Sequence, residues 1–396
     1  MRVIVLIFFP LFLCTSCKKS DNKNPAPSSA LSTSNITQLR DSKTTTTFHF
    51  AIDVNPVSTK NISVNYATKD GTAVSGKDYT AVSGTLTIPA NQLSGYIDVV
   101  VSADSLRQDD QTFTLVLSSP VNATLSVSQV TGTIQNLGTY LPVDNSGYTS
   151  ALTYSGMTLA WSDEFSGKTL NESNWTYETG GSGWGNNELE YYTNSVKNTF
   201  LTGGYLVIEA RKESFGTNNY TSARLKTEDK KTFTYGRIDI RAKFPKGQGL
   251  WPALWMLGNN ISQSGYGWPA CGEIDIMELL GQDPRKFYST VHWGQANSSF
   301  HDSKGSNYSL SSGSFYDTFH VFSMLWDSGK MQFLIDDYPY YTVNKSDITT
   351  GTYPFDKPFF FILNVAVGGN WPGNPDSSIT FPQRMIVDYV RIFQAV

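Results

Sequence analysis

GEIDIMELL, residues 272–280, places three acids in an otherwise apolar, strand-like run. Carboxylates are costly to bury in such a run unless chemistry or a partner holds them there. Because side chains alternate between the two faces of a strand, Glu273 and Asp275 share one face, whereas Glu278 would point to the other. One extra residue, accommodated as a β-bulge, returns Glu278 to the face of the first two acids, and Met277 is the natural candidate for that residue.

Two carboxyl groups on one face suit the cleavage of a glycosidic bond. Cleavage with retention of configuration needs a nucleophile and an acid/base about 5–5.5 Å apart. The acid must keep its proton near neutral pH, and a neighbouring carboxylate helps by raising its pKa. Two alternatives are open at this point. One is a solvated acidic face, which the flanking isoleucine and leucine residues disfavour, and the other is a calcium site, which usually asks for more oxygen ligands along a loop.

The segment at 271–278 resembles the active-site strand of glycoside hydrolase family 16 in its bulged, laminarinase-like form. The likeness runs from about Leu159 to the C-terminus. Further blocks carry it in matching order: GWGNNELEYY at 183–192, YGRIDIRAK at 235–243, GLWPALWM at 249–256 and VDYVRIF at 387–393. The resemblance implies a retaining endo-glycosidase of β-1,3-glucan, with Glu273 as the nucleophile, Asp275 as its assistant and Glu278 as the general acid/base.

The resemblance leaves the glycan open. Family members with the bulged motif act on several polysaccharides, so agar, carrageenan and mixed-linkage β-glucan are alternatives. A transglycosylase, in which a sugar rather than water resolves the glycosyl-enzyme, is another. A non-catalytic glucan-binding protein is disfavoured, because relatives of that kind lack the glutamates that this chain keeps. The loop at 183–192 looks most like laminarinases, which favours 1,3-linked laminarin.

Aromatic residues near the acids are candidates for sugar binding, because their rings offer a flat apolar face with a polar handle. Trp251 and Trp255 are four positions apart, so both face the same way on a strand, although core packing is open for either. Trp184 lies in a glycine-rich loop. Of the neighbours His292 and Trp293, one faces the acids if the next strand lies alongside. The predicted substrate-binding residues are Trp184, Asn187, Arg224, Trp251, Trp255, His292 and Trp293, with Glu188, Asn364 and Trp371 as further candidates.

The pattern of the whole chain predicts an all-β protein with two domains. Apolar and polar residues alternate in short runs, as at 62–66 and 97–101, and turn-forming residues separate such runs at roughly 8–12-residue spacing. We expect a β-sandwich at 36–137, a turn-rich linker at 138–157 and a catalytic domain at 158–396. By the family resemblance, the catalytic domain is a concanavalin-like β-jelly roll whose concave face forms a cleft.

The first domain resembles a Calx-β domain, a small immunoglobulin-like sandwich. The likeness rests on VNYATKDGTA at 64–73, GKDY at 76–79 and DDQTFTLVL at 109–117. Some members of that family bind calcium through acids at one end, but here Gln111 replaces one acid and IQNL at 134–137 replaces an acid-rich run. We therefore predict a spacer or accessory module, with Asp70 and Asp78 serving turns.

The N-terminus predicts export and a lipid anchor. Residues 3–13 form an apolar run that is too short to span a membrane and is typical of a signal peptide. Small residues before Cys17 resemble a bacterial lipoprotein cleavage box. We predict a signal peptide at 1–17, lipidation of Cys17 at the cell surface or in the periplasm, and a flexible linker at 18–35. Because Cys14 is atypical in such a box, secretion without lipid is the alternative.

Composition and charge narrow the partners. The chain has 30 basic and 34 acidic residues, and no basic stretch suggests a nucleic-acid partner. Its 9 Trp, 21 Tyr and 23 Phe residues suit a neutral, polyhydroxylated ligand. The resemblance implies no required cofactor, but a structural calcium on the convex side at Glu164, Gly204 and Asp388. With Cys14 removed in the signal peptide and Cys17 lipidated, Cys271 is left alone, so we expect no intramolecular disulfide. We also expect a monomer.

Overall fold

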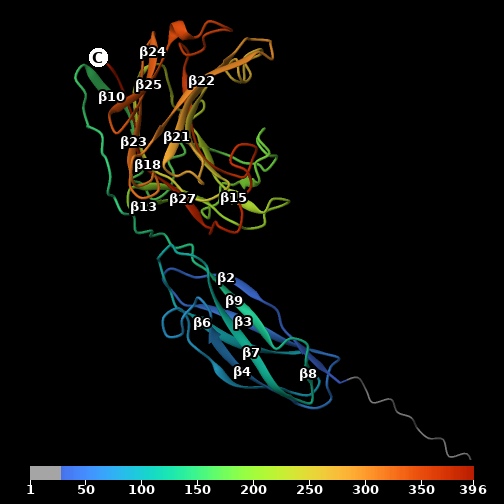
Figure 1. The fold of residues 1–396 in the computed structure, drawn as a ribbon. Coiled ribbons are helices and arrows are strands. Elements are labelled where there is room, and N and C mark those ends of the chain that lie inside the picture. Colours follow the sequence, from blue (N-terminus) through green and yellow to red (C-terminus); the bar gives the residue numbers. More distant parts are fainter. Residues whose placement is uncertain (1–27) are drawn as a thin grey trace, which may run out of the picture. The chain divides into compact units, whose positions relative to one another are not determined.

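The computed structural model describes residues 28–396, which form two units built of β-strands (Figure 1). The predicted signal peptide and Cys17 lie outside the described residues, as does most of the predicted linker at 18–35. The described part of the chain contains one short 3₁₀ helix, η1 (Lys345–Asp347), and no α-helix. None of its helices is long and apolar enough to cross a membrane. The fold class is therefore all-β.

The N-terminal unit is a β-sandwich with a hydrophobic core of its own. One sheet has the strand order β6-β3-β1-β8, and the other has the order β2-β9-β7-β4-β5. The core contains Phe48, Phe50 and Phe113, whose rings pack edge to face. The strands are β1 (Ala30–Ser32), β2 (Ile36–Leu39), β3 (Thr46–Asn55), β4 (Ile62–Asp70), β5 (Ser83–Ile88), β6 (Ser94–Val101), β7 (Gln111–Val121), β8 (Thr124–Leu125) and β9 (Gln129–Gln135).

The predicted linker at 18–35 is wrong at its C-terminal end. β1 pairs antiparallel with β3 and parallel with β8, and Leu31 at its centre is fully buried. The strand contributes only one large apolar side chain, so its sequence shows too little periodicity to be told from a spacer. The tertiary pairing, rather than the local pattern, defines this strand.

Two large antiparallel sheets make up the second unit. The first sheet has the order β13-β14-β27-β18-β23-β24-β25, with β10 also beside β27. Its strands are β10 (Met157–Asp163), β13 (Thr199–Thr202), β14 (Tyr205–Ala210), β18 (Gly236–Lys243), β23 (His320–Trp326), β24 (Lys330–Ile335), β25 (Tyr338–Asn344) and β27 (Gln383–Ala395).

The second sheet has the order β11-β16-β26-β19-β20-β21-β22, with β17 beside β26. Its strands are β11 (Thr176–Glu178), β16 (Arg224–Lys226), β17 (Thr232–Phe233), β19 (Leu250–Gly258), β20 (Glu273–Leu279), β21 (Lys286–Gly294), β22 (His301–Ser309) and β26 (Phe359–Val367). A separate parallel pair joins β12 (Glu190–Tyr192) to β15 (Tyr220–Ser222). The acid motif therefore lies on a central strand of this sheet, β20.

One face of the second sheet packs on the first sheet, and the other is free to form a site. Leu254, Ile274 and Val291, on three neighbouring strands, are fully buried in the shared core. Because side chains alternate along a strand, the residues next to them point away from the core. The acids of β20 are among those residues.

The segment predicted as a linker at 138–157 is irregular, but the second unit holds it. Arg241 donates from Nη2 to Asn145 O at 2.8 Å and from Nε to Tyr148 O at 2.6 Å. The backbone N–H of Ser150 donates to the hydroxyl of Tyr389 at 2.9 Å. These bonds fix the segment against strands β18 and β27, so most of it belongs to the second unit.

Replacing Leu31 by Ala should destabilise the N-terminal sandwich by about 2–5 kcal/mol, because it removes a fully buried side chain. Amide hydrogen exchange in residues 30–135 measures the loss. Tryptophan fluorescence reports the second unit separately, since every Trp of the chain lies between Trp161 and Trp371. Leu93→Ala is the control, because Leu93 is exposed. Equal effects of the two changes would contradict the burial of β1.

Candidate active site

Strand β20 contains the bulge that the acid spacing predicts. On the β19 side, Asp275 and Met277 lie opposite consecutive residues, so Ile276 between them has no partner. On the β21 side, Asp275 and Glu278 are three positions apart, but the residues opposite them are only two positions apart. The bulge is therefore confirmed, with Ile276 rather than Met277 as the residue without a partner on β19.

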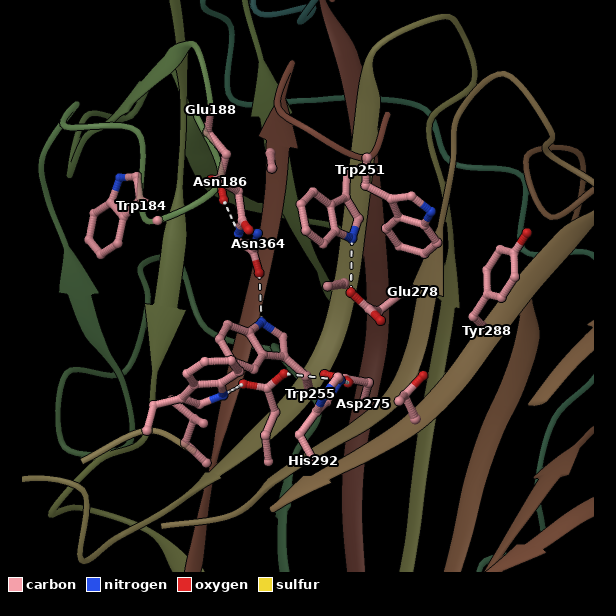
Figure 2. Close-up of a pocket in the computed structure, with 18 of the residues that line it drawn as sticks. Trp184, Asn186, Glu188, Trp251, Trp255, Asp275, Glu278, Tyr288, His292 and Asn364 are labelled. Carbon is pink, nitrogen blue, oxygen red and sulfur yellow. Dashed lines mark hydrogen bonds and ion pairs between the residues drawn. The ribbon is translucent and has the colours of Figure 1, made fainter. Parts of the chain in front are cut away.

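The bulge brings the three acids to one side of the sheet. Ile276 and Met277 are both buried in the core, whereas Glu273, Asp275 and Glu278 line a cavity of about 630 Å³ (Figure 2). The side chain of Glu273 is 16% exposed and that of Asp275 only 3%. The acids are thus open to a ligand in the cavity but largely removed from bulk water.

The cavity is walled by side chains from neighbouring strands of the same sheet and from three loops. Strand β19 contributes the indoles of Trp251 and Trp255, which confirms that both face the same way. Many of the other walls are aromatic or polar. They include Trp184, Asn186, Glu188, Arg224, Trp268, Tyr288, Thr290, His292, His301, Asn364 and Trp371.

Each outer acid receives an indole N–H. Trp251 donates from Nε1 to Glu278 Oε1 at 3.0 Å, and Trp268 donates from Nε1 to Glu273 Oε2 at 2.8 Å. The central acid has a different neighbour. His292 Nε2 lies 3.2 Å from Asp275 Oδ2 and 3.7 Å from Glu273 Oε1. Figure 2 shows Trp251 directed at Glu278 and His292 beside Asp275.

Burial raises the pKa of all three carboxyls. Burial, followed by the charge of Asp275, raises the pKa of Glu273 to about 8, while the nearby His292 acts in the opposite direction. Burial also raises the pKa of Asp275 to about 8. The pKa of Glu278 is raised well above its ordinary value by burial, then by Asp275 and Glu273. Three such close carboxyls cannot all be ionised at neutral pH, and Glu278, opposed by both neighbours, keeps its proton.

A chain of hydrogen bonds supports the wall formed by Trp255. Its Nε1 donates to Asn364 Oδ1 at 2.8 Å, and Asn364 Nδ2 donates to the hydroxyl of Tyr192 at 3.1 Å. That hydroxyl donates to Glu188 Oε2 at 3.1 Å. The indole of Trp255 is therefore fixed by partners that reach the loop at 183–192.

Arg224 lies between two tryptophans of the cavity. Its guanidinium carbon is 4.8 Å from the ring centroid of Trp184 and 4.7 Å from that of Trp255. A cation over two indole faces stabilises both rings. Glu178 pairs with the same guanidinium. The structure thus places Arg224 and Trp184 in the cavity wall, as the sequence predicts.

Two predicted substrate-binding residues lie elsewhere. The prediction for Trp293 is wrong, because its side chain is 3% exposed, packs in the core and donates to Thr350 O. Its neighbour His292 takes the cavity side, since adjacent residues on a strand point to opposite faces. Asn187 is exposed and does not line the cavity, and it donates from Nδ2 to Asn370 Oδ1 at 2.9 Å. Its contact with a substrate stays a prediction.

Sequence reasoning missed Trp268, Tyr288 and His301. Trp268 lies in the turn before β20, and only its position five residues ahead of Glu273 could have drawn attention to it. His301 begins β22, which is paired with β21, and His292 Nδ1 lies 3.0 Å from its Nε2. A hairpin prediction for β21 and β22 would have brought the two imidazoles together.

The acids predicted to bind structural calcium are engaged by arginines. Arg391 donates two hydrogen bonds to Glu164, at 2.8 and 2.7 Å, and Arg241 donates to Asp388 at 2.7 Å. Gly204 lies in the turn between β13 and β14. Carboxylates that are already neutralised by arginines do not fit a cation in this arrangement. The calcium stays a prediction without support from these side chains.

Acids of the first unit serve turns, as predicted. Asp70 accepts hydrogen bonds from the backbone of Ser75 and the hydroxyl of Tyr79. Asp78 accepts from the backbone of Val74 and from the amide of Gln111. These bonds close the loop that follows β4.

Comparison with known proteins agrees with this geometry. A family model described as glycosyl hydrolases family 16 matches residues 172–391, more than half of the chain. The chain belongs to glycosyl hydrolases family 16. A second model, for the Calx-beta domain, matches residues 28–136. The family-16 chain thus carries an N-terminal Calx-beta domain.

Relatives of this family-16 chain match over its second unit. A β-glucanase of Rhodothermus marinus is 40% identical, over 60% of this chain and 85% of that protein. A glucan endo-1,3-β-glucosidase of Cryptopygus antarcticus is also 40% identical, over 61% of this chain and 93% of that protein. Among solved structures, the catalytic domain of a laminarinase from Thermotoga petrophila matches with a TM-score of 0.56 and 46% identity, covering 60% of this chain and 98% of that domain.

Trp293→Ala should cost about 3–5 kcal/mol of stability, because it empties a core position. Trp268→Ala should cost about 1 kcal/mol or less, because Trp268 is 51% exposed and makes one side-chain hydrogen bond. Urea unfolding followed by far-ultraviolet circular dichroism measures both without depending on tryptophan emission. Equal losses would contradict the assignment of Trp293 to the core and of Trp268 to the cavity.

Proposed function

We propose that this chain is a retaining endo-1,3-β-glucanase that hydrolyses laminarin-type β-glucan through a glycosyl-enzyme intermediate. One observation carries the proposal. The bulge in β20 places Glu273 and Glu278 on the same wall of an aromatic-lined cavity, with Asp275 between them. Double displacement at an anomeric carbon uses two carboxyl groups that flank the same glycosidic bond.

In the first step, a carboxylate oxygen of Glu273 attacks the anomeric carbon while Glu278 gives its proton to the departing glycosidic oxygen. The raised pKa of Glu278 suits it to hold that proton. In the second step, Glu278 accepts a proton from water, which attacks the same carbon and releases Glu273. The N–H of Trp268 and the imidazole of His292 act against the burial that raises the pKa of Glu273, and so favour its ionised form.

The substrate assignment is supported by the relatives and by the cavity. The laminarinase domain is 46% identical and is covered almost completely. The indoles of Trp184, Trp251 and Trp255 in the cavity wall suit the apolar faces of glucose rings. A digest panel of laminarin, lichenan, agar and carrageenan with product sizing tests the linkage. Products longer than the substrate would indicate transglycosylation.

We further propose that the protein is exported and anchored to a membrane by a lipid. The apolar run at 3–13 and the small residues before Cys17 support a lipidated, surface-attached enzyme. We also propose that the protein acts as a monomer.

Glu273→Gln should abolish laminarin hydrolysis, and Glu278→Gln should reduce kcat by about 10²–10⁴-fold, because the first removes the nucleophile and the second the proton donor. Reducing-end release measures both, and proton NMR of the first product reports whether the anomeric configuration is retained. Glu172→Gln is the control, because Glu172 is an exposed acid of the same unit. Wild-type turnover in Glu273→Gln would end the assignment.

Asp275→Asn should move the pH profile of kcat/KM to lower pH. The charge of Asp275 raises the pKa of both Glu273 and Glu278, so its removal lowers both values. The acid limb, where Glu273 becomes protonated, and the alkaline limb, where Glu278 loses its proton, then shift in the same direction. Asp283→Asn, at an exposed site outside the cavity, should leave the profile in place. An unshifted profile in Asp275→Asn would show that Asp275 is uncharged in the working range.

A further inference from the structure

We propose that Glu273, Asp275 and His292 form a binding site for one divalent transition-metal ion, such as Zn²⁺ or Cu²⁺. Among the described residues, these three are the group of acidic and histidine side chains whose potential ligand atoms converge, all lying within 4.8 Å of one another. The binding itself is independent of the proposed function. Only its consequence, reversible inhibition, rests on that function, because the ion would occupy the nucleophile.

The separations suit a small cation. Zinc takes nitrogen and oxygen ligands at about 2.0–2.2 Å in a tetrahedral arrangement, which places ligand atoms roughly 3.3–3.6 Å apart. His292 Nε2 is 3.2 Å from Asp275 Oδ2 and 3.7 Å from Glu273 Oε1. These two separations lie within about 0.1 Å of that range, on either side of it, and all three ligand atoms lie within 4.8 Å of one another.

Asp275 provides an independent indication of a missing ligand. Its side chain is 97% buried, yet within the described part of the chain Oδ2 accepts no hydrogen bond. A buried carboxylate oxygen without a hydrogen-bond donor is costly, and the contact with His292 Nε2 at 3.2 Å offsets that cost only when the imidazole is protonated. This oxygen is the one that faces His292, so a cation held between them would satisfy it.

The surroundings of His292 permit a metal-binding tautomer. A ligating imidazole nitrogen must carry a lone pair, which requires the proton to sit on the other ring nitrogen. His292 Nδ1 lies 3.0 Å from His301 Nε2, so it can donate its proton there and leave Nε2 free toward the acids. Metal-bound histidines commonly have such an outer partner. The ring of Trp268, 4.8 Å from that of His301, holds this partner in place.

The chemistry of the three ligand atoms determines which class of metal ion the site prefers. One imidazole nitrogen and two carboxylate oxygens suit zinc or copper, whereas calcium and magnesium prefer oxygen ligands alone and more of them. Three protein ligands leave a coordination position open to water or a sugar hydroxyl. The cavity provides the entry path. An ion there would engage the Glu273 oxygen nearest His292 and keep it from an anomeric carbon.

Calorimetric titration of the full chain with Zn²⁺, after removal of metals, tests the site. We expect one saturable site that Mg²⁺ does not fill. His292→Phe should abolish it, and His301→Phe should weaken it about 10–100-fold through loss of the outer partner. Both changes keep a planar ring. His49→Gln, an exposed histidine of the first unit, should bind like the wild type. Binding that is absent, or unchanged in His292→Phe, would overturn the proposal.

A second measurement separates this proposal from the proposed function. Laminarin oligosaccharide should weaken Zn²⁺ binding by competition, and Zn²⁺ should inhibit laminarin hydrolysis until a chelator restores it. If the chain binds Zn²⁺ through His292 but does not cleave laminarin, the function fails and the metal site stands. If it cleaves laminarin unaffected by saturating Zn²⁺, the function stands and the inhibitory site fails.

Discussion

The bulge at Ile276 is the constraint on which the rest of the site depends. Two adjacent residues, Ile276 and Met277, both enter the core, which a regular strand would forbid. The distortion leaves backbone groups without ladder partners, and Ser289 donates its hydroxyl hydrogen to Ile276 O at 2.6 Å to satisfy one of them. Because Met277 and Ile276 together fill core space, slipping back to a regular register would expose one of them and bury Glu278 among apolar side chains. The packing of Ile276 and Met277 in the core thus keeps Glu278 on the cavity side of the sheet.

Burying the three acids costs free energy, and contacts with neighbouring side chains offset that cost to different degrees. Indole N–H groups serve the outer two, through Trp268 at Glu273 and Trp251 at Glu278. The central acid, Asp275, instead has the imidazole of His292 at 3.2 Å. A donor on each outer acid fixes its orientation, while the weakly compensated central acid keeps a strong field on both neighbours. The unequal support therefore distinguishes the two acids proposed to take part in bond changes from the central acid proposed to tune their pKa values.

The sequence revealed more about β20 than about its surroundings, for a physical reason. Side chains alternate between the two faces of a strand, and Glu278 breaks that alternation within residues 272–280. These nine residues were therefore enough to predict the bulge and the shared face of Glu273 and Glu278. Which of His292 and Trp293 faces the acids depends on the register between two strands, and the local pattern leaves that undetermined. Trp268 reaches Glu273 from a turn, where no periodicity predicts direction. Leu31 shows the same limit, since a short strand is defined by the partners it pairs with.

Among the described residues, no group donates a hydrogen bond to Asp275 Oδ2, and this oxygen links the proposed catalysis to the proposed metal binding. A neutral donor placed against Oδ2 would relieve its burial, but it would also weaken the negative potential that keeps the proton on Glu278. The same potential attracts a cation whenever His292 presents a lone pair beside it. A site in which a carboxylate without a hydrogen-bond donor raises the pKa of a neighbouring acid can therefore also attract small cations. His301 sits where it can shift this balance, because the proton it shares with His292 determines whether Nε2 donates to the acids or accepts an ion.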